Sequence, residues 1–383
     1  MIKTILFTFT LVGGLVGLII GFIQFAMGSY QKVKKTSLMT LIFVIGLLTI
    51  AIVSQRRAHT PEIDQDTGIA ELIQVDVNGK KEWVSIRGKD MNNPIILFLA
   101  GGPGGSQLGA VRRNLAELEE EFVVVNWEQP GSGKSYQAMP INGISINTYI
   151  EDGIEITNYL RNRFERDKIY LMGESWGSFL GIFLAKEMPE SYYAFIGTGQ
   201  MVDFAETEQV CYDLALQRAK AKSDTDTIEE LNKIGPPPYS GKNIALKAGV
   251  YLQYLSGEMS HNPNIHNAGY ETLEDLASEE YGVIDQINFI RGIVTTFSNL
   301  YPQLWDIDLR QGFTEIDIPI YMFVGRHDLN APTNLTEEYF NLIQAPDKKL
   351  IWFEHSGHSP WINEKDLFCE KTIHLFVQHE NEF

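Results

Sequence analysis

The sequence predicts an α/β fold: a mostly parallel sheet flanked by helices, with an inserted helical segment and two membrane-spanning helices at the N-terminus. Three observations predict it. Two uncharged apolar runs cover residues 5–27 and 36–54, and short apolar runs then alternate with helical patterns. That alternation stops between residues 201 and 312 and resumes afterwards. Strands that alternate with helices form parallel sheets covered on both faces.

Composition and charge narrow the class of protein. The 383 residues carry a formal net charge of −18, spread along the chain, which disfavours a nucleic-acid partner. Cys211 and Cys369 lie far apart and show no metal-ligand spacing and no disulfide framework. We therefore expect a folded, enzyme-sized body with no metal and no cofactor.

The two N-terminal runs each have about the ~20 residues that a helix needs to cross a hydrocarbon core. A short stretch with Lys32, Lys34 and Lys35 separates them, which predicts a helical hairpin. A cleavable signal peptide is disfavoured because the first run is too long and no small-residue cleavage site precedes the second. We expect a multi-pass membrane protein with two spans. The loop lysines favour a cytoplasmic loop and an extracytoplasmic catalytic domain, although Lys3, Arg56 and Arg57 nearly balance them.

The strands of the sheet are predicted by short apolar runs. The alternating run at residues 73–77 reaches Asn78-Gly79 and continues at residues 84–86, which is the pattern of a tight β-hairpin. Further buried strands are predicted at residues 95–99, 122–125, 169–172, 194–196, 318–324 and 350–353.

Helical patterns fill the intervals. Thr148 and Glu151 can form a capping box at the start of the clearest helix. Strand signals fade at residues 201–312, which predicts a helical insertion inside the sheet domain. The predicted organisation is a transmembrane pair at residues 1–57, a sheet domain at residues 58–200 and 313–383, and the insertion at residues 201–312.

The pentapeptide Gly173-Glu174-Ser175-Trp176-Gly177 follows one predicted strand and precedes a helical pattern. This is the context of a nucleophile elbow, in which a strained strand-to-helix turn lifts a serine above the sheet edge. The flanking glycines suit a tightly packed turn that leaves no room for a Cβ. Ser175 is therefore the predicted nucleophile.

A serine hydroxyl needs a base within hydrogen-bond reach, and that base needs a carboxylate to hold its tautomer. Asp328 follows the predicted strand at 318–324, and His358 follows the one at 350–353. The order Ser, Asp, His, with each residue at a strand end, predicts a triad of Ser175, Asp328 and His358. His327 and His355 are nearby rivals, and His355 sits close enough to its strand to be packed or to support the site from outside.

Two backbone groups are predicted to form the oxyanion hole. One is the N–H of Trp176, directly after the nucleophile. The other comes from Gly101-Gly102-Pro103-Gly104-Gly105, where Pro103 has no N–H and Gly102 is the choice. The alternative for this loop is a tight turn without a catalytic part. Another glycine-rich segment, Gly131-Ser132-Gly133-Lys134-Ser135, lacks the earlier glycine of a phosphate-binding loop and has Glu128 instead, so we predict no nucleotide site.

These motifs, with Gln129-Pro130 and the Gly357-His358 pair, resemble the proline iminopeptidase branch of the α/β-hydrolases. The resemblance covers residues 93–200 and 316–361 and implies an α/β-hydrolase fold whose insertion is a helical cap over the active site. Ala100 stands where the family usually has histidine, and Glu128-Gln129-Pro130 replace the family's Asp-Gln-Arg. The cap does not clearly reproduce the acidic segment that holds a substrate's amine in the family.

The substrate hypotheses follow from the resemblance. Removal of one N-terminal residue requires recognition of a cationic amine, for which Glu206 and Glu208 are the candidates. The alternative for this pair is a solvated acidic first turn of a helix. We expect a membrane-anchored serine hydrolase that forms an acyl-enzyme on a peptide or small-molecule substrate, as an aminopeptidase or as a general esterase. A catalytically silent binding protein of the same fold is the third hypothesis, and the oligomeric state stays open.

Overall fold

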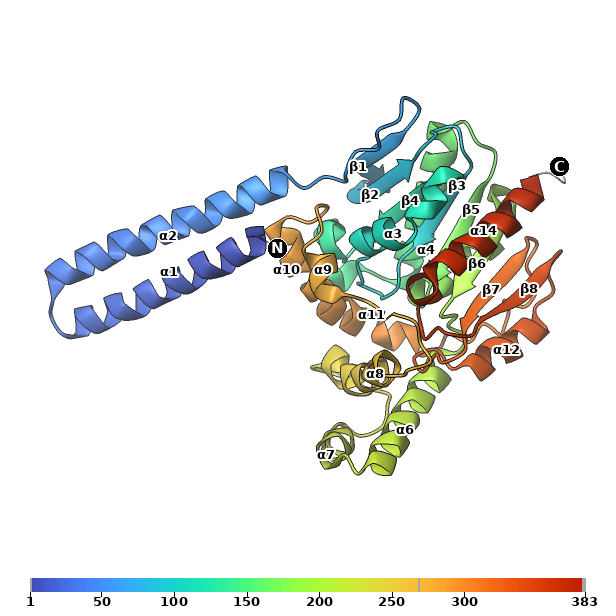
Figure 1. Cartoon of the computed structure of the whole chain (residues 1–383). Helices are drawn as coiled ribbons and strands as arrows, with labels where there is room; N and C mark the ends of the chain where they lie inside the picture. Colours follow the sequence, from blue (N-terminus) through green and yellow to red (C-terminus); the bar gives the residue numbers. More distant parts are fainter. Residues whose placement is uncertain (1, 268, 381–383) are drawn as a thin grey trace.

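The computed structural model describes residues 2–267 and 269–380 (Figure 1). Its sheet has eight strands in the order β1-β2-β4-β3-β5-β6-β7-β8, in which β1 pairs with β2 and β2 with β4 antiparallel while the remaining pairs are parallel. The strands are β1 Ile69–Val77, β2 Lys80–Gly88, β3 Ile95–Leu99, β4 Val123–Glu128, β5 Ile169–Glu174, β6 Tyr192–Thr198, β7 Ile320–Gly325 and β8 Lys348–Phe353. A mostly parallel sheet flanked by helices is thereby confirmed. The carboxyl ends of the parallel strands meet at one edge.

The first hairpin forms where the alternating pattern predicts it. Asn78 and Gly79 occupy the two positions between β1 and β2, with φ of 51° and 77°. Two consecutive residues with positive φ give the turn a twist that matches the two strands it joins, and Asn-Gly tolerates this backbone best.

Helices cover both faces of the sheet because alternate strand residues point to opposite sides. Along β3, Ile96 and Phe98 pack on one side with α3 Leu108–Asn114 and α14 Lys365–Glu380. Leu97 and Leu99 pack on the other side with α4 Ile146–Arg163, α5 Trp176–Glu187 and α12 Thr333–Leu342. The central strands β3, β4, β5 and β7 are buried along their whole length.

One local prediction was wrong. The capping box at the start of α4 is formed by Ser145 and Thr148, not by Thr148 and Glu151. The Ser145 hydroxyl accepts the Thr148 N–H at 3.2 Å, and the Ser145 N–H donates to the Thr148 hydroxyl at 3.1 Å. Threonine here supplies the return acceptor that glutamate usually supplies, so the helix begins three residues earlier.

Between β6 and β7 the chain forms a layer of helices at the edge where the parallel strands end (Figure 1). These are α6 Phe204–Lys222, α7 Thr225–Ile234, α8 Ile244–Ser260, α9 Thr272–Leu276, α10 Val283–Arg291, the π-helix η5 Gly292–Thr296 and α11 Phe297–Leu304. The two ends of this insertion are joined by a bridge between Asp203 and Asp308. Arg310 reinforces the bridge with ion pairs of 2.8 Å to both carboxylates.

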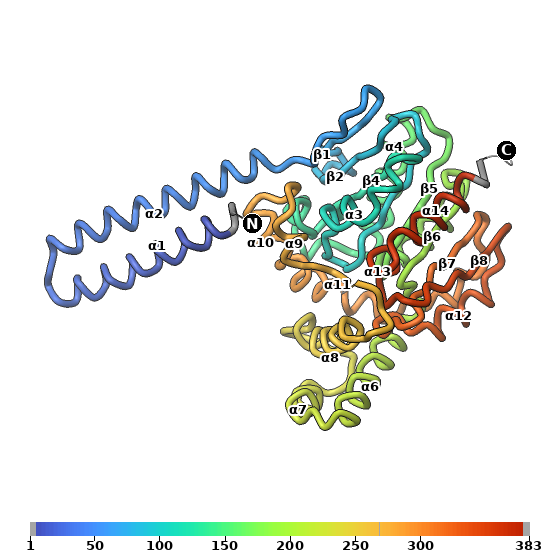
Figure 2. The backbone as a smooth tube through the Cα atoms, viewed as in Figure 1, coloured from blue at the N-terminus to red at the C-terminus, as the bar shows by residue number. Residues whose placement is uncertain are grey.

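The N-terminal helices α1 Ile2–Ala26 and α2 Tyr30–Arg56 form an antiparallel pair that projects from the rest of the molecule (Figure 2). Both are long and apolar enough to cross a membrane, and only 6% of each helix's most apolar window is buried. They are therefore not core helices of the sheet domain. The far end of α2 contacts α10, because the Ser54 hydroxyl accepts the Val283 N–H at 3.1 Å and the Gln55 amide donates to Asp285 at 2.6 Å.

Candidate active site

Ser175 occupies the turn between β5 and α5 with φ of 54° and ψ of −119°. A residue with a side chain rarely adopts this backbone, and such strain is characteristic of a nucleophile elbow. The turn is possible because the chain approaches itself closely on both sides. A Cβ at Gly173 would collide with the Gly177 carbonyl, and a Cβ at Gly177 would collide with the Leu99 carbonyl.

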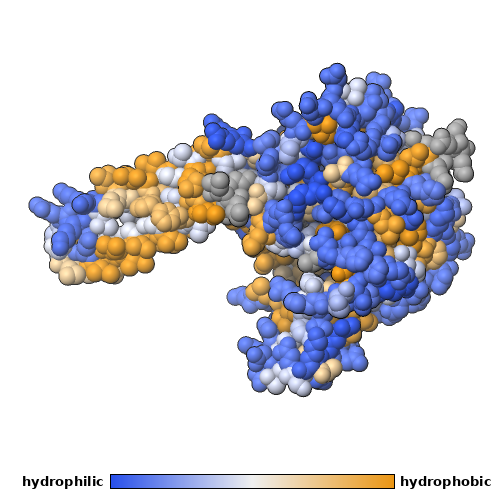
Figure 3. Space-filling view, viewed as in Figure 1, coloured by the Kyte–Doolittle hydropathy of each residue, from blue (hydrophilic) through white to orange (hydrophobic). Residues whose placement is uncertain are grey.

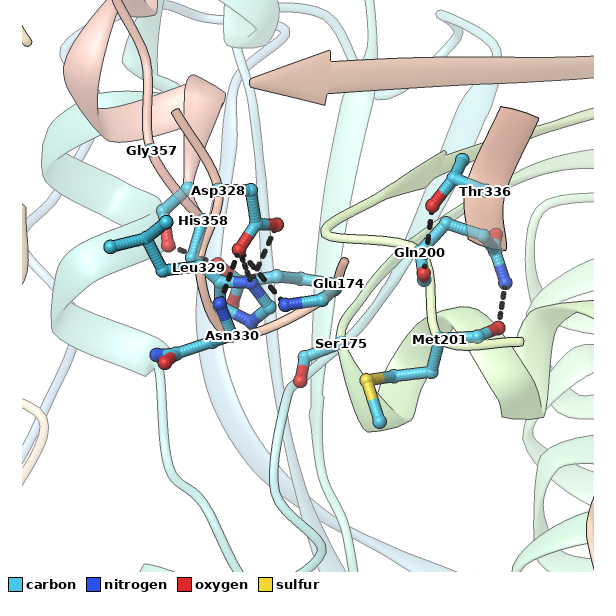
Figure 4. Close-up of polar contacts among 12 residues, drawn as sticks. Glu174, Ser175, Gln200, Met201, Asp328, Leu329, Asn330, Thr336, Gly357 and His358 are labelled. Carbon is cyan, nitrogen blue, oxygen red and sulfur yellow. Dashed lines mark hydrogen bonds and ion pairs between the residues drawn. The ribbon is translucent and has the colours of Figure 1, made fainter. Parts of the chain in front are cut away.

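His358 and Asp328 come together beside this turn. The His358 Nδ1 lies 2.9 Å and 3.1 Å from the two carboxylate oxygens of Asp328. Asp328 is fixed in turn by the backbone N–H groups of Asn330 and Ala331, which donate to Oδ1 at 2.8 Å and 2.9 Å. His358 lies between Asp328 and Ser175, with its other nitrogen free of this carboxylate (Figure 4). The three predicted residues are thus neighbours at one edge of the sheet.

The electrostatics of His358 come from two opposed influences. Burial is the largest and favours the neutral imidazole, but the charge and hydrogen bond of Asp328, with the charge of Glu174, outweigh it and raise the pKa of His358 to about 9. A carboxylate that stabilises the imidazolium in this way suits a histidine that must accept a proton during the reaction.

The two rival histidines are engaged elsewhere. The His355 ring stacks on His266 with 4.1 Å between centroids, and its Nδ1 lies 3.0 Å from the Asn264 carbonyl oxygen. His327 lines a cavity that His358 does not line, together with Arg218, Glu258 and Asp328. The geometry therefore favours His358 over both.

The two proposed oxyanion donors follow neighbouring strands, Gly102 after β3 and Trp176 after β5. Trp176 is the first residue of α5, so its N–H has no carbonyl within the helix to bond. Gly102 has φ of 150°, and a Cβ there would approach the Gly104 and Gly105 nitrogens to 2.7 Å. Gln129 connects the segment after β3 to the segment after β5. Its amide donates to the Ala100 carbonyl at 3.3 Å and accepts the Trp176 indole N–H at 2.9 Å.

Two further residues shape the site and were missed by the sequence reasoning. The buried carboxylate of Glu174 accepts hydrogen bonds from Gln107, Tyr270, Ser359 and Trp361. It thereby connects the nucleophile strand to the loop that follows His358. The motif displays Glu174, but only the fold reveals its four donors.

Gly199, after β6, is the second. It has φ of 51°, and a Cβ there would lie 2.8 Å from the His358 Cε1. A glycine after a strand gives no sequence signal of such a contact.

The two candidate amine-binding residues differ. Glu206 is 43% exposed and pairs at 2.8 Å with Arg310, the same arginine that pairs with Asp203 and Asp308. Glu208 is buried and accepts a hydrogen bond from Tyr251, and burial raises its pKa to about 7. Cys211, one turn further along α6, contacts the Leu329 carbonyl at 3.4 Å, which places this face of the helix beside the Asp328 loop.

Two cavities adjoin the site. The larger, about 890 Å³, starts at Gly102, Pro103 and Gly105 and runs between α8 and η5. The smaller, about 280 Å³, is lined by His358 together with polar residues that include Ser256 and Asn330.

Comparison with known proteins agrees with this geometry. Residues 105–227 match the family model described as serine aminopeptidase, S33. The probable aminopeptidase YbaC of Bacillus subtilis is 31% identical over 319 residues, which are 83% of this chain and 99% of YbaC. A proline iminopeptidase of Heyndrickxia coagulans is 26% identical over 77% of this chain and 94% of its own.

The fold recurs in the crystal structure of the proline iminopeptidase of Mycobacterium smegmatis, with a TM-score of 0.57 and 16% identity over 82% of this chain and 99% of that one. The chain therefore belongs to the α/β-hydrolase superfamily, in its proline iminopeptidase-like branch.

Proposed function

We propose that this chain is a membrane-anchored serine hydrolase that cleaves an ester or amide through an acyl-enzyme on Ser175. The observation that carries the proposal is the strained backbone of Ser175 beside a histidine held by a buried carboxylate, with Nδ1 2.9 Å from Asp328. A silent binding protein would need neither the strain nor the paired histidine.

In the first step the Ser175 hydroxyl oxygen attacks the substrate carbonyl carbon, and its proton passes to the free nitrogen of His358. The N–H groups of Gly102 and Trp176 stabilise the negative oxygen that forms. The bond to the leaving group then breaks as His358 returns the proton to that group. Water next attacks the acyl-enzyme, gives its proton to His358 and releases the acid, and Ser175 regains a proton.

Rapid-mixing kinetics with 4-nitrophenyl acetate test this scheme. A burst of nitrophenol equal to the enzyme concentration is expected, because acylation releases it before water frees the acetate. Ser175→Ala should abolish the burst and lower the steady rate by several orders of magnitude, while circular dichroism shows an intact fold. Turnover that survives the substitution would contradict the proposal.

Aminopeptidase activity is a second, narrower candidate. The names of the relatives and the buried carboxylate of Glu208 near the Asp328 loop support it. Chromogenic amides of proline and alanine, with a free or an acetylated amine, separate the candidates. Preference for the free amine that is lost in Glu208→Gln favours the aminopeptidase, and equal cleavage of both forms leaves a general esterase.

The hairpin of α1 and α2 is the proposed anchor. Its orientation, with the catalytic domain on the extracytoplasmic side, rests on Lys32, Lys34 and Lys35, which lie in the first two turns of α2 beside the turn between the two helices. Labelling of single introduced cysteines by a membrane-impermeant maleimide in intact cells tests this. Labelling of a cysteine at Ser240, an exposed position between α7 and α8, is expected, whereas a cysteine at Gln31, an exposed position in the first turn of α2, should react only after lysis.

A further inference from the structure

We propose that the substrate carries a long apolar acyl chain, that this chain occupies the cavity between α8 and η5, and that it enters from the bilayer surface. This inference rests on the proposed serine hydrolase activity and adds the substrate class and the direction of entry. Three groups of observations carry it.

The first is the position of the two cavities relative to the reaction. The leaving group must lie beside His358, because the histidine gives it a proton. His358 lines the smaller cavity, whose walls include polar residues such as Ser256, Asn330 and Asn363. The acyl part must then extend past the oxyanion loop on the other side, where Gly102 and Pro103 begin the larger cavity.

The second is the character of that larger cavity. Its walls carry apolar side chains, among them Leu246, Val250, Leu252, Ile293 and Phe297. Among the described lining residues Glu230 alone is charged. A volume of about 890 Å³ exceeds what a single amino acid needs and lies within the range of pockets that enclose drug-sized ligands.

The third is the surface beside this cavity. Ile284, Ile287, Ile290 and Ile293 follow one another at intervals of three along α10 and η5, and each is 41–47% exposed. We call these four residues the isoleucine stripe. Ile293 also lines the cavity, as does Leu246, which is 59% exposed. The stripe therefore leads along ~13 Å of helix to the cavity wall.

The membrane hairpin fixes where the stripe lies. Val283 and Asp285, at the start of α10, bond to Ser54 and Gln55 at the end of the second apolar helix. The base of the hairpin lies beside α10 (Figure 1). Hydrophobic surface covers the hairpin and continues onto the cap beside its base (Figure 3). Exposed isoleucines held at the end of a membrane span suit the headgroup boundary of a bilayer.

A buried ion pair connects this region to the active site. The Lys134 ammonium, only 1% exposed, lies 2.8 Å from Asp285 and 3.0 Å from the Glu280 carbonyl oxygen. The Thr296 hydroxyl donates to the Gly131 carbonyl at 2.8 Å. The segment that resembled a phosphate-binding loop thus holds α10 and η5 against the oxyanion loop.

The test uses the full chain reconstituted in phosphatidylcholine vesicles and a series of 4-nitrophenyl esters. Burial of each methylene can raise kcat/KM by up to about fourfold. The kcat/KM for 4-nitrophenyl octanoate should therefore exceed that for 4-nitrophenyl acetate by at least about tenfold. Gly249→Phe places a ring in open space inside the cavity wall and should bring the octanoate-to-acetate ratio close to one. Gly257→Phe, on the same helix and outside both cavities, should keep the ratio.

A second arm tests the entry route. The triple change Ile284→Ser, Ile287→Ser and Ile290→Ser should lower the rate of hydrolysis of vesicle-borne 4-nitrophenyl dodecanoate about fivefold, relative to the rate with dissolved 4-nitrophenyl acetate. Leu342→Ser, an equally exposed apolar residue on α12, serves as the control.

The outcomes separate the two levels of the account. A wild-type chain that hydrolyses neither ester overturns the proposed function. Two results overturn the acyl-chain inference alone. One is hydrolysis of the acetate ester with no higher kcat/KM for the octanoate ester. The other is an octanoate-to-acetate ratio of kcat/KM that Gly249→Phe leaves unchanged. Equal rates for the stripe variant and the wild type on vesicle-borne ester overturn entry from the bilayer.

Discussion

At the scale of single residues, the pairing of His358 with Asp328 makes a pH dependence the clearest consequence. The pKa of His358 is raised to about 9, and the neutral imidazole is the form that accepts the serine proton. We expect kcat/KM to rise about tenfold per pH unit below this pKa and to level off above it. Initial rates with 4-nitrophenyl acetate between pH 6 and 10, corrected for spontaneous hydrolysis, measure this.

Asp328→Asn provides the control for this profile. Removal of the charge that raises the pKa of His358 should move the rising limb to lower pH while the plateau falls by about 10⁴-fold. A limb that stays in place would show that another group titrates. If His355→Ala proves more damaging than His358→Ala, the base is misassigned.

Gly199 gives a second residue-scale prediction. Gly199→Ala should lower kcat about 10- to 100-fold with little change in KM, because the added methyl would lie 2.8 Å from the imidazole and displace it. The pH limb should shift as well, since the imidazole would move relative to Asp328. Gly235→Ala, which has a positive φ of 71° and open space around it, controls for backbone strain. Equal loss of activity in both variants would remove the positioning role.

The residues of the candidate site were predictable to different degrees. Ser175, Asp328 and His358 each follow a strand, so chain order alone brings them to one edge. Glu174 and Gly199 act through contacts with segments far away in the sequence, and Gln129 joins two loops that only the fold makes adjacent. Such contacts carry no local pattern from which they could be predicted.

At the scale of elements, the buried pair of Lys134 and Asp285 ties α10 to the loop after β4. Lys134→Met should lower the free energy of unfolding by about 3 kcal/mol, because it leaves a carboxylate buried without its cation. The double variant Lys134→Met, Asp285→Met should recover part of this loss. Urea denaturation followed by tryptophan fluorescence measures both.

An exposed ion pair supplies the control. Lys81 and Asp76 lie 2.6 Å apart with both side chains more than 60% exposed, so Lys81→Met should cost less than about 0.5 kcal/mol. A similar cost for the two lysines would contradict the structural role of Lys134.

The strands were easier to predict than the ends of helices. Short apolar runs predict β3 to β8, and alternation around Asn-Gly predicts β1 and β2. Burial on both faces leaves few other compositions for the central strands. The start of α4 was misplaced because Ser145 and Thr148 cap it with two hydroxyls, a variant of the box that usually includes glutamate. The arrangement of α6 to α11 could not be predicted, because Tyr251 and Tyr301 pack into the core through contacts that no periodicity displays.

At the scale of the whole molecule, the hairpin and the sheet domain should be separable. Removal of residues 1–57 leaves the core, the triad and both cavities intact, and the freed groups of Asp285 and Val283 gain water in place of Gln55 and Ser54. We expect a soluble protein that hydrolyses dissolved 4-nitrophenyl acetate. Its rate on the vesicle-borne dodecanoate ester, relative to the acetate ester, should be lower than that of the full chain. Sedimentation with vesicles and the two ester assays measure this, and a folded but inactive fragment would show that the hairpin shapes the site.

The central claim is that Ser175 is an activated nucleophile, and covalent capture tests it most directly. The full chain, reacted with a fluorophosphonate probe and digested, should yield one modified peptide with the phosphonyl group on Ser175. The adduct should be absent in His358→Ala and in heat-unfolded protein, since activation needs the folded histidine. A fluorophosphonate that leaves Ser175 unmodified in the folded wild-type chain, or that labels another serine instead, would contradict the account.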